Sequence, residues 1–325
     1  MVKRVSYMNR LIHSMWNGEI KVITGIRRCG KSVLLFDLFF EYLLSQNVSE
    51  DHILKIELDQ RRYYKFRNPI ALCEYVESIV RDKKGEKFYL FIDEVQLTTK
   101  VVDKENGGIE VTIYDMLNEL KAYKNLDVYV TGSNSKGLSK DIATEFRGRA
   151  TQIHVFPLSF AEFYSAVGGD ERKALDIYML YGSMPRLLAL EDDREKKDYL
   201  TSLYSELYVR DIVERNGIER EDVLNDILDL LASQISSLTN PTNIANTISS
   251  MKNEKVNPAM VSNYVQYIID SFLISMARRY DVKGKTYFKY PNKYYYTDIG
   301  LRNARLNYRQ YDPGHIMENM IYNEL

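Results

Sequence analysis

The stretch Gly25-Ile-Arg-Arg-Cys-Gly-Lys-Ser32 has the spacing of a phosphate-binding loop, G-x-x-x-x-G-K-[ST]. Its two glycines, Gly25 and Gly30, permit the tight backbone that turns successive N–H groups onto phosphate oxygens. Lys31 supplies a point charge for the β and γ phosphates, and the Ser32 hydroxyl is a ligand for Mg²⁺. The candidate nucleotide-binding residues are Gly25, Arg28, Gly30, Lys31, Ser32 and Val33.

The residues on either side of this loop have the patterns of a strand and a helix. Residues 20–24 form an apolar run typical of a buried strand, and apolar residues recur at helical spacing from Lys31 to about Ser45. A helix that begins at the loop offers its N-terminus to an anion. Within the loop, we interpret Cys29 as a tolerated small side chain rather than a reactive thiol. Arg28 has two interpretations, contact with phosphate or a partner, and packing or exposure to solvent.

Composition and charge describe a globular protein of two or three domains. The 325 residues are 45% hydrophobic and 27% charged, with a net charge of −1. Residues 160–230 carry 17 acidic against 9 basic side chains, whereas residues 251–309 carry 11 basic against 4 acidic ones. An acidic region followed by a basic one indicates separate modules.

Cysteine usage and hydropathy predict a cytoplasmic protein without a membrane partner. Cys29 and Cys73 show neither zinc spacing nor a disulfide framework. The first residues lack the apolar core of a signal peptide. The most apolar run, residues 33–44, is interrupted by Asp37 and Glu41 and is too short to span a bilayer.

Strand and helix patterns alternate up to residue 158. After the strand at 20–24, further strands are expected at 53–58, 88–92, 126–130 and 150–156. This alternation predicts an α/β core domain, residues 1–158, with a parallel sheet flanked by helices. Residues 100–110 are expected to form an exposed insertion.

The strand patterns stop after residue 158. Helical patterns fill residues 159–238, which we interpret as a lid-like helical region. Residues 239–310 have the outline of a winged-helix domain, because two short helical patterns precede two alternating stretches. Residues 311–325 are expected to begin a further module.

Asp93 and Glu94 follow the apolar strand 88–92, at the edge where open α/β sheets bind ligands. Asp93 is expected to hold Mg²⁺ with Ser32, and Glu94 to polarise the attacking water. The alternative interpretation is a solvated acidic turn.

Polar and basic residues around the next two strands complete the predicted catalytic set. Asn134 or Ser133, after the strand at 126–130, is expected to contact the γ-phosphate or orient the water. Arg147 or Arg149 is a candidate arginine finger that acts in its own subunit or in a neighbour. The alternatives are turns without catalytic roles. The candidate catalytic residues are Lys31, Glu94, Asn134, Arg147 and Arg149.

The chain resembles the prokaryotic AAA-type P-loop ATPases that carry a C-terminal domain of unknown function. The segments that carry the resemblance are, in order, GIRRCGKS, YLFIDEVQ, VTGSNS, EFRGRATQIHVFPLSFAEF, GSMPRLL, RRYDVKGKTYF and KYYYTDIGLRNA, and they cover nearly the whole chain. The resemblance implies a core that hydrolyses ATP rather than GTP, a helical and winged-helix region, and a nuclease-like module at the end. It assigns Lys31 and Ser32 to the first phosphate motif, and Asp93 and Glu94 to the second. It places Asn134 in the sensor region and Arg147 or Arg149 in the finger region.

The sequence departs from this family pattern at its end. The pattern normally continues past residues 314–319 into a strand and helix with further acidic and lysine residues, whereas this sequence ends at Leu325. Nuclease activity is therefore not predicted for these residues. Glu318 is expected at an exposed helix position, and the alternative is the first acid of the nuclease-like module.

The basic residues of the winged-helix region favour contact with double-stranded DNA. These residues are Arg278, Arg279, Lys283, Lys285, Lys289 and Lys293. They suit a wing that contacts the phosphate backbone, mainly through electrostatics. The helical pattern at 258–269 has no lysine or arginine to read base edges, so docking of a protein remains the alternative.

The leading hypothesis is a Mg²⁺-dependent ATPase whose nucleotide state repositions the winged-helix region, which acts on DNA. The alternatives are a nucleotide-gated DNA-binding regulator and a protein-docking switch, both with little turnover. The expected partners are ATP, double-stranded DNA, and a protein partner or a second copy of the chain.

Overall fold

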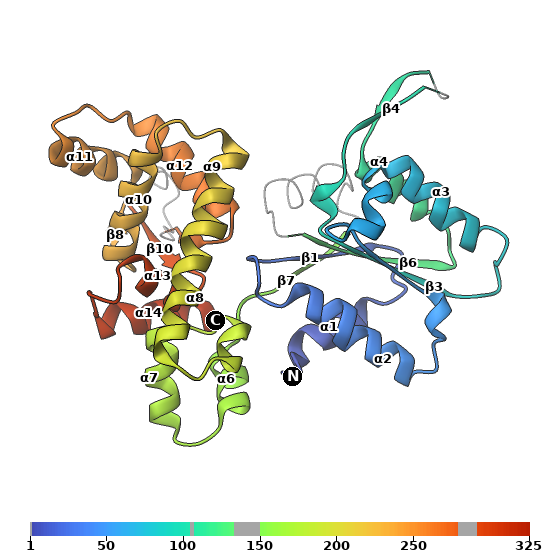
Figure 1. Cartoon of the computed structure of the whole chain (residues 1–325), viewed down its shortest axis with the longest axis horizontal. Helices are drawn as coiled ribbons and strands as arrows, with labels where there is room; N and C mark the ends of the chain where they lie inside the picture. The colour runs from blue at the N-terminus through green and yellow to red at the C-terminus, as the bar shows by residue number, and fades with distance from the viewer. Residues whose placement is uncertain (1, 105–106, 133–149, 279–290) are drawn as a thin grey trace, which may run out of the picture. The chain divides into compact units, whose positions relative to one another are not determined.

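A computed structural model describes residues 2–104, 107–132, 150–278 and 291–325. The chain divides into two units, Met1–Val155 and Phe156–Leu325 (Figure 1). The finer division predicted from the sequence, with boundaries at 158, 238 and 310, stays a prediction. Among the described residues, none of the helices combines the length and the apolar character that crossing a bilayer requires.

Unit 1 contains a sheet of five parallel strands in the order β2-β3-β6-β1-β7. The strands are β1 (Ile20–Thr24), β2 (Ile53–Glu57), β3 (Phe88–Asp93), β6 (Leu126–Gly132) and β7 (Ala150–His154). Every residue of β1, β3 and β6 is buried, as expected for central strands that are covered on both faces. The predicted α/β parallel sheet is therefore confirmed.

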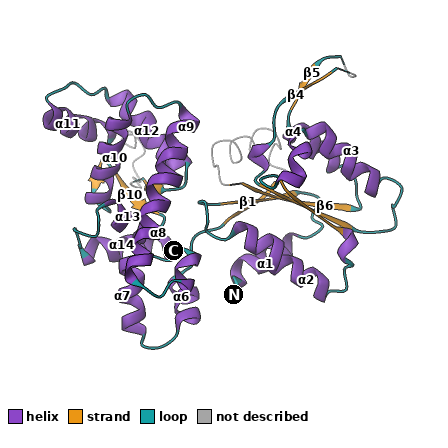
Figure 2. Cartoon of the chain, viewed as in Figure 1, coloured by secondary structure: helices purple, strands orange, loops and turns teal. Residues whose placement is uncertain are grey.

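Helices cover both faces of this sheet (Figure 2). One face carries α1 (Val5–Ser14), the π-helical segment η1 (Val33–Phe39) and α2 (Phe40–Ser45), and the other carries α3 (Pro69–Val80) and α4 (Ile113–Leu120). Leu72 and Val76 of α3 belong to a core cluster that includes residues of β1, β2, β3 and β6. On the opposite face, the ring of Phe39 lies 5.0 Å from that of Tyr129 and 5.8 Å from that of Phe91. Short 3-10 turns in this unit are η2 (Glu50–His52), η3 (Arg61–Arg67) and η4 (Val95–Leu97).

The insertion expected at residues 100–110 contains an antiparallel hairpin. Its strands are β4 (Val101–Asp103) and β5 (Ile109–Val111), which pair only with each other among the described strands. Val102 and Ile109 are 57% and 64% exposed. The hairpin lies outside the five-stranded sheet and leaves the order of its strands unaffected (Figure 1).

The described part of unit 2 is largely helical, with one small sheet. Its helices are α6 (Phe160–Val167), α7 (Glu171–Tyr181), η5 (Pro185–Ala189), α8 (Asp193–Ser202), η6 (Leu203–Val209), α9 (Arg210–Asn216), α10 (Glu221–Ser233), α11 (Pro241–Lys252), α12 (Pro258–Asp270), α13 (Ile299–Arg305) and α14 (Pro313–Glu324). The sheet has the order β8-β10-β9, from β8 (Leu238–Thr239), β9 (Ile274–Ala277) and β10 (Asn292–Tyr296). The two-residue strand β8 was absent from the sequence interpretation, because two residues are too few to show an alternating pattern.

Asp298 joins two distant segments inside unit 2. One of its carboxylate oxygens accepts from the Ser183 N–H at 2.7 Å, and the other accepts from the Leu301 N–H at 3.1 Å. A Cβ on Gly300 would lie 1.8 Å from the Tyr181 carbonyl oxygen, so only glycine permits this approach of α13 to the end of α7. Burial raises the pKa of Asp298 to about 6, against the opposing effect of the hydrogen bonds from backbone N–H groups.

Helix α14 packs on β10 of the small sheet. The Asn319 side chain accepts from the Tyr296 N–H at 2.7 Å and donates to the Tyr296 carbonyl at 2.8 Å, in the manner of a neighbouring strand. Glu318 accepts from Lys293 Nζ at 2.7 Å and from the Tyr295 hydroxyl at 2.8 Å. Glu318 therefore lies on a helix, as expected, with 40% of its side chain exposed, and it is paired with Lys293.

Candidate active site

The phosphate loop follows β1 directly and has the unusual backbone that its glycines permit. The φ angles of Gly25 and Gly30 are +146° and +102°, and that of Arg28 is +62°. A Cβ on Gly25 would lie 2.1 Å from the Val155 carbonyl oxygen. Glycine is therefore required at position 25 by its conformation and by the close approach of β7.

The Lys31 side chain is held inside the loop. Its Nζ donates to the carbonyl oxygens of Gly25 and Ile26, both at 3.0 Å, and the residue is 4% exposed. These carbonyls are weaker partners for an ammonium than a phosphate oxygen, because a charged acceptor forms the stronger hydrogen bond. The Lys31 ammonium is thus held by the backbone carbonyls of the loop itself.

Asp93 lies at the end of β3 and accepts hydrogen bonds from two hydroxyls of different elements. Ser32 Oγ donates to Oδ2 at 2.7 Å, and Thr131 Oγ1 donates to Oδ1. Thr131 reaches Asp93 because β6 is the strand next to β3, between it and β1. Burial raises the pKa of Asp93, while the Thr131 and Ser32 hydrogen bonds act in the opposite direction.

Glu94 has a left-handed backbone, with φ 53° and ψ 50°. Its N–H donates to Thr131 Oγ1 at 3.2 Å, and its carboxylate accepts from the Gln96 side-chain amide. For a residue other than glycine this conformation costs on the order of 1 kcal/mol, so it persists only where surrounding contacts hold it. The contact with Thr131 holds the Glu94 backbone in this conformation, and the contact with Gln96 fixes the direction of the Glu94 carboxylate.

The carboxyl end of β7 supports the phosphate loop from the other side. Cys29 is fully buried, and its Sγ donates to the Val155 carbonyl at 3.3 Å, which agrees with the interpretation as a packed small residue. His154 Nδ1 is hydrogen-bonded to Thr24 Oγ1 at 3.1 Å. Burial, followed by the charges of Lys31 and Arg10, lowers the pKa of His154 to about 4, so its imidazole is neutral near pH 7.

The structure brings six of the predicted residues together at the carboxyl edge of the sheet. They are Gly25, Gly30, Lys31, Ser32, Asp93 and Glu94. Arg28 and Val33, also predicted to bind nucleotide, have exposed side chains. Asn134, Arg147 and Arg149 lie outside the described residues. The roles assigned to all of these residues stay predictions.

The sequence interpretation missed Gln96 as a residue of this site. It expects the polar side chains of residues 131–134 to face the same crevice as Asp93 and Glu94, and Thr131 does contact Asp93, but that particular pairing depends on strand order, which local pattern does not give. Gln96 had a usable signal, because it follows Glu94 by two residues at the end of a buried strand.

Comparison with known proteins identifies the family. Residues 17–164 match the family described as "AAA domain", and residues 172–312 match a "Domain of unknown function (DUF8612)". An uncharacterized protein of Haemophilus influenzae is 30% identical over 330 residues, which cover 100% of this chain and 78% of that protein. The chain belongs to this family of AAA-domain proteins with a C-terminal domain of unknown function. An uncharacterized protein of Methanocaldococcus jannaschii is also 30% identical, with 100% of this chain and 70% of that protein covered.

Several solved structures are distantly similar to the chain. The Aeropyrum pernix ORC1 protein in complex with DNA has a TM-score of 0.35 at 13% identity, with 100% of this chain and 95% of that chain covered. AMPPCP-bound DnaA from Aquifex aeolicus has a TM-score of 0.38 at 14% identity, with 82% and 88% covered. These TM-scores are too low to carry an argument, so the family rests on the sequence relatives.

Proposed function

We propose that this AAA-domain protein binds and hydrolyses ATP with Mg²⁺, and that its nucleotide state repositions the C-terminal region. The supporting observation is the 2.7 Å hydrogen bond from Ser32 Oγ to Asp93 Oδ2, which joins the end of the phosphate loop to the end of β3. The two residues expected to share a metal ion are thus adjacent although 61 positions separate them. A solvated acidic turn would not require this contact.

The donor set at this point fits Mg²⁺. A hydroxyl and a carboxylate are hard oxygen ligands, which this ion prefers. Ser32 and Asp93 would hold the ion, directly or through water. When bound, Mg²⁺ would neutralise charge that develops on the transferred phosphoryl group.

The side chains around Asp93 have separate tasks in this proposal. Lys31 binds the phosphates, since it is the cation inside the loop. Glu94 orients the attacking water, and the Gln96 amide holds the Glu94 carboxylate until substrate is in place. Thr131 fixes Asp93 and the Glu94 backbone together, so the metal-binding and water-orienting groups keep one relative position.

Two substitutions test this function in the full chain. We expect Lys31→Ala to weaken ATP binding and to lower turnover by roughly 10²-fold or more, because one charged contact to phosphate is lost. We expect Glu94→Gln to retain ATP binding and to lose turnover. Glu110→Gln on the exposed hairpin is the matched control, with unchanged binding and turnover. The proposal fails if the unsubstituted protein neither binds nor hydrolyses ATP, with or without DNA.

A second candidate function is nucleotide-gated binding of double-stranded DNA with little turnover. The order α11, α12, β9, β10, with a small three-stranded sheet, supports a winged-helix interpretation of residues 239–310. On α12, the exposed side chains include Ser262, Asn263 and Gln266, which can hydrogen-bond base edges without being charged. Helix α12 carries no lysine or arginine, which limits its contact with phosphates more than its contact with bases.

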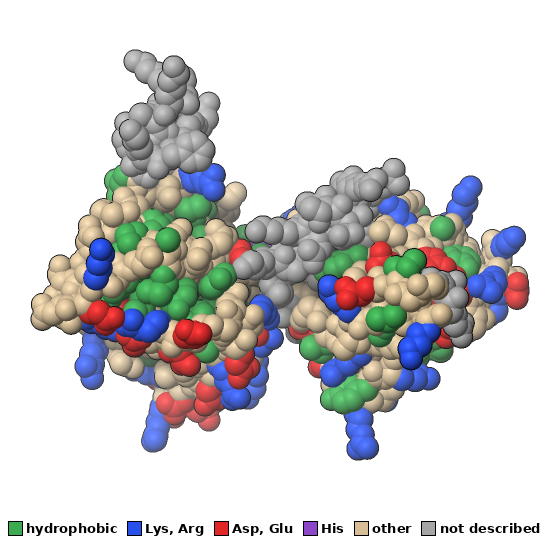
Figure 3. Space-filling view, turned by 90° about the horizontal axis from the view of Figure 1, so that it is seen from above, with side chains coloured by type: hydrophobic (Ala, Val, Ile, Leu, Met, Phe, Trp, Pro, Cys, Tyr) green, Lys and Arg blue, Asp and Glu red, His purple; other side chains and the backbone are tan. Residues whose placement is uncertain are grey.

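Two of the basic residues predicted to contact DNA, Arg278 and Lys293, lie in the part of the chain that the structure describes. Lys293 pairs with Glu318 at 2.7 Å and is therefore a poor phosphate contact, whereas Arg278 is exposed. Arg279, Lys283, Lys285 and Lys289 lie outside the described residues. On the face drawn in Figure 3, acidic and basic side chains of unit 2 are interspersed.

DNA binding measured across a salt series tests this candidate. We expect replacement of both Lys283 and Lys285 by Gln to weaken binding to all sequences and to reduce the salt dependence. Asn263→Ala is expected to change sequence preference with the salt dependence retained. Binding that is absent at low salt, or unaffected by all three replacements, would contradict a winged-helix contact.

A further inference from the structure

We propose that Cys73, Glu77 and Glu119 form a binding site for a divalent cation of the zinc type on the outer helical layer of unit 1. The site is built from α3 and α4 and shares no residue with the phosphate loop, Asp93 or Glu94. It is therefore independent of the proposed ATPase function.

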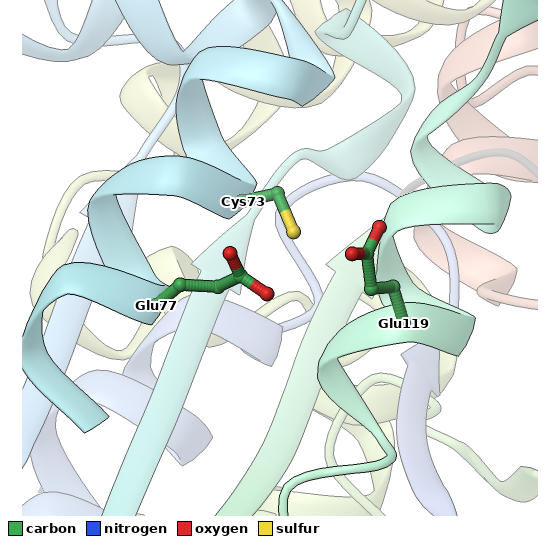
Figure 4. A group of neighbouring side chains, drawn as sticks. All are labelled: Cys73, Glu77 and Glu119. Atoms are coloured by element: carbon green, nitrogen blue, oxygen red, sulfur yellow. The ribbon is translucent and has the colours of Figure 1, made fainter. Parts of the chain in front are cut away.

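The three side chains converge from two packed helices. Cys73 and Glu77 are four positions apart on α3 and so lie on one face of that helix, and Glu119 comes from the last turn of α4. One ligand atom from each residue lies within 4.8 Å of the other two. Figure 4 shows the Cys73 sulfur directed toward the space between the two carboxylates. Small side-chain rotations would bring the three atoms onto one ion.

Cys73 distinguishes this group from an ordinary pair of surface acids. It is 4% exposed, and its thiol has no hydrogen-bond partner among the described residues. Cys73 belongs to the hydrophobic core cluster of unit 1, and its sulfur is directed toward the two carboxylates (Figure 4). Binding of a cation as thiolate would require the Cys73 thiol to pass its proton to solvent.

Neighbouring side chains already orient the Glu77 carboxylate. The Tyr123 hydroxyl donates to Oε1 at 2.8 Å, and an Arg81 guanidinium nitrogen donates to Oε2 at 2.6 Å. Carboxylates that bind metal ions are commonly held in this way by outer hydrogen bonds. Each oxygen retains a lone pair, so these bonds fix the direction of Glu77 without occupying all of its acceptor capacity.

The ligand types select the class of ion. A thiolate with two carboxylates suits Zn²⁺, which accepts sulfur and oxygen ligands and takes a water molecule at its fourth position. Mg²⁺ and Ca²⁺ prefer oxygen ligands alone, so they would compete weakly. Binding would also connect α3 to α4 and so stabilise unit 1 by mass action.

Titration of the full chain with Co²⁺ as a probe for zinc tests the site, in nucleotide-free and phosphate-free buffer. We expect one equivalent of Co²⁺ to give a thiolate-to-cobalt charge-transfer band, which Zn²⁺ abolishes by displacement. Cys73→Ser should lose the band, whereas Cys29→Ser, which changes the other buried cysteine, should retain it. Glu119→Gln changes an exposed residue and should fold normally, with affinity for Co²⁺ about tenfold or more lower.

Two further results decide the proposal. Glu74→Gln, a neighbouring acid outside the cluster, should leave the affinity unchanged. Absence of the band from the unsubstituted protein, or equal Co²⁺ affinity of the Glu119→Gln and Glu74→Gln variants, would overturn the site and indicate an adventitious ion only. Because nucleotide is absent, failure here leaves the ATPase proposal untouched.

Discussion

Asp93 in unit 1 and Asp298 in unit 2 are both buried, both follow the buried part of a strand, and both have a pKa raised by burial. Their hydrogen-bond donors differ. Asp93 is held by the hydroxyls of Ser32 and Thr131, whereas the short bonds to Asp298 come from the backbone N–H groups of Ser183 and Leu301, with the Ser183 hydroxyl at a longer 3.4 Å.

This difference separates an adaptable carboxylate from a fixed one. A hydroxyl rotates, and it can accept as well as donate, so the partners of Asp93 can change roles when a ligand enters. A backbone N–H only donates, and its position is set by the chain. The surroundings of Asp93 thus suit binding, and those of Asp298 suit the joining of α7 to α13.

The largest expected effect comes from Asp93→Asn. We expect ATP turnover to fall by about 10²-fold or more, because the substitution removes the charge that would hold Mg²⁺. The free energy of unfolding should change little, since the hydroxyl that faces the new NH2 group can reverse to accept from it, while the other continues to donate to the amide oxygen. Steady-state turnover and urea unfolding of the same preparation measure the two effects. A variant that is strongly destabilised but retains turnover would show that Asp93 has a structural role, like Asp298, rather than a binding role.

Asp298→Asn should have the opposite profile. The NH2 group of the new side chain would face a backbone N–H, so two donors would oppose each other without an acceptor. An unsatisfied buried polar group costs about 1–3 kcal/mol. Urea unfolding followed by far-ultraviolet circular dichroism should show this loss, with ATP affinity retained. Ser165→Ala, at an exposed position of the same unit, is the control. If unfolding is unchanged, the two N–H bonds do not hold the segments together.

The contributions of Asp298 and His154 to the pH dependence of stability should differ in sign. Burial gives Asp298 a pKa of about 6 in the folded protein, against an ordinary value of 3.8, so the folded protein binds more protons between these two pH values. Stability from this group is therefore present at low pH and falls by at most roughly 3 kcal/mol as pH rises through about 6. His154, with a pKa lowered from 6.5 to about 4, acts oppositely, and its contribution is lost as pH falls.

Unfolding of each unit across this pH range can be followed separately. The chain has one tryptophan, Trp16, which lies in unit 1, so its fluorescence reports that unit. Hydrogen exchange of α7 and α13 reports the other. Asp298→Asn should flatten the response of unit 2 alone, and His154→Gln that of unit 1 alone. Identical pH profiles in the variants and the original protein would contradict these assignments.

Substitution of Thr131 should give the smallest expected loss of ATP turnover. Thr131→Val keeps the shape but removes the hydroxyl between Asp93 and Glu94, and we expect turnover to fall about tenfold. Thr131→Ser retains the hydroxyl and should stay near the original rate. Comparison of the two rates isolates the hydrogen bond from packing, and equal losses would assign the effect to packing.

The sequence alone determined the local features of this protein. The phosphate-loop spacing, the apolar runs of β1, β3 and β6, and the acids that follow β3 are properties of short segments. For this reason the parallel α/β sheet and the family could be predicted, and both are confirmed. The positions of Gly25, Lys31 and Asp93 at one edge of the sheet follow from the same local rules.

The tertiary structure decided which segments meet. Placement of β6 between β1 and β3 brings Thr131 to Asp93, and the packing of α13 on α7 buries Asp298 against Ser183. The pairing of β8 with β10, and of Glu318 with Lys293, likewise depends on residues far apart in the chain. Local propensity acts over a few residues, whereas these contacts form only when long chain segments close and bury their apolar faces together.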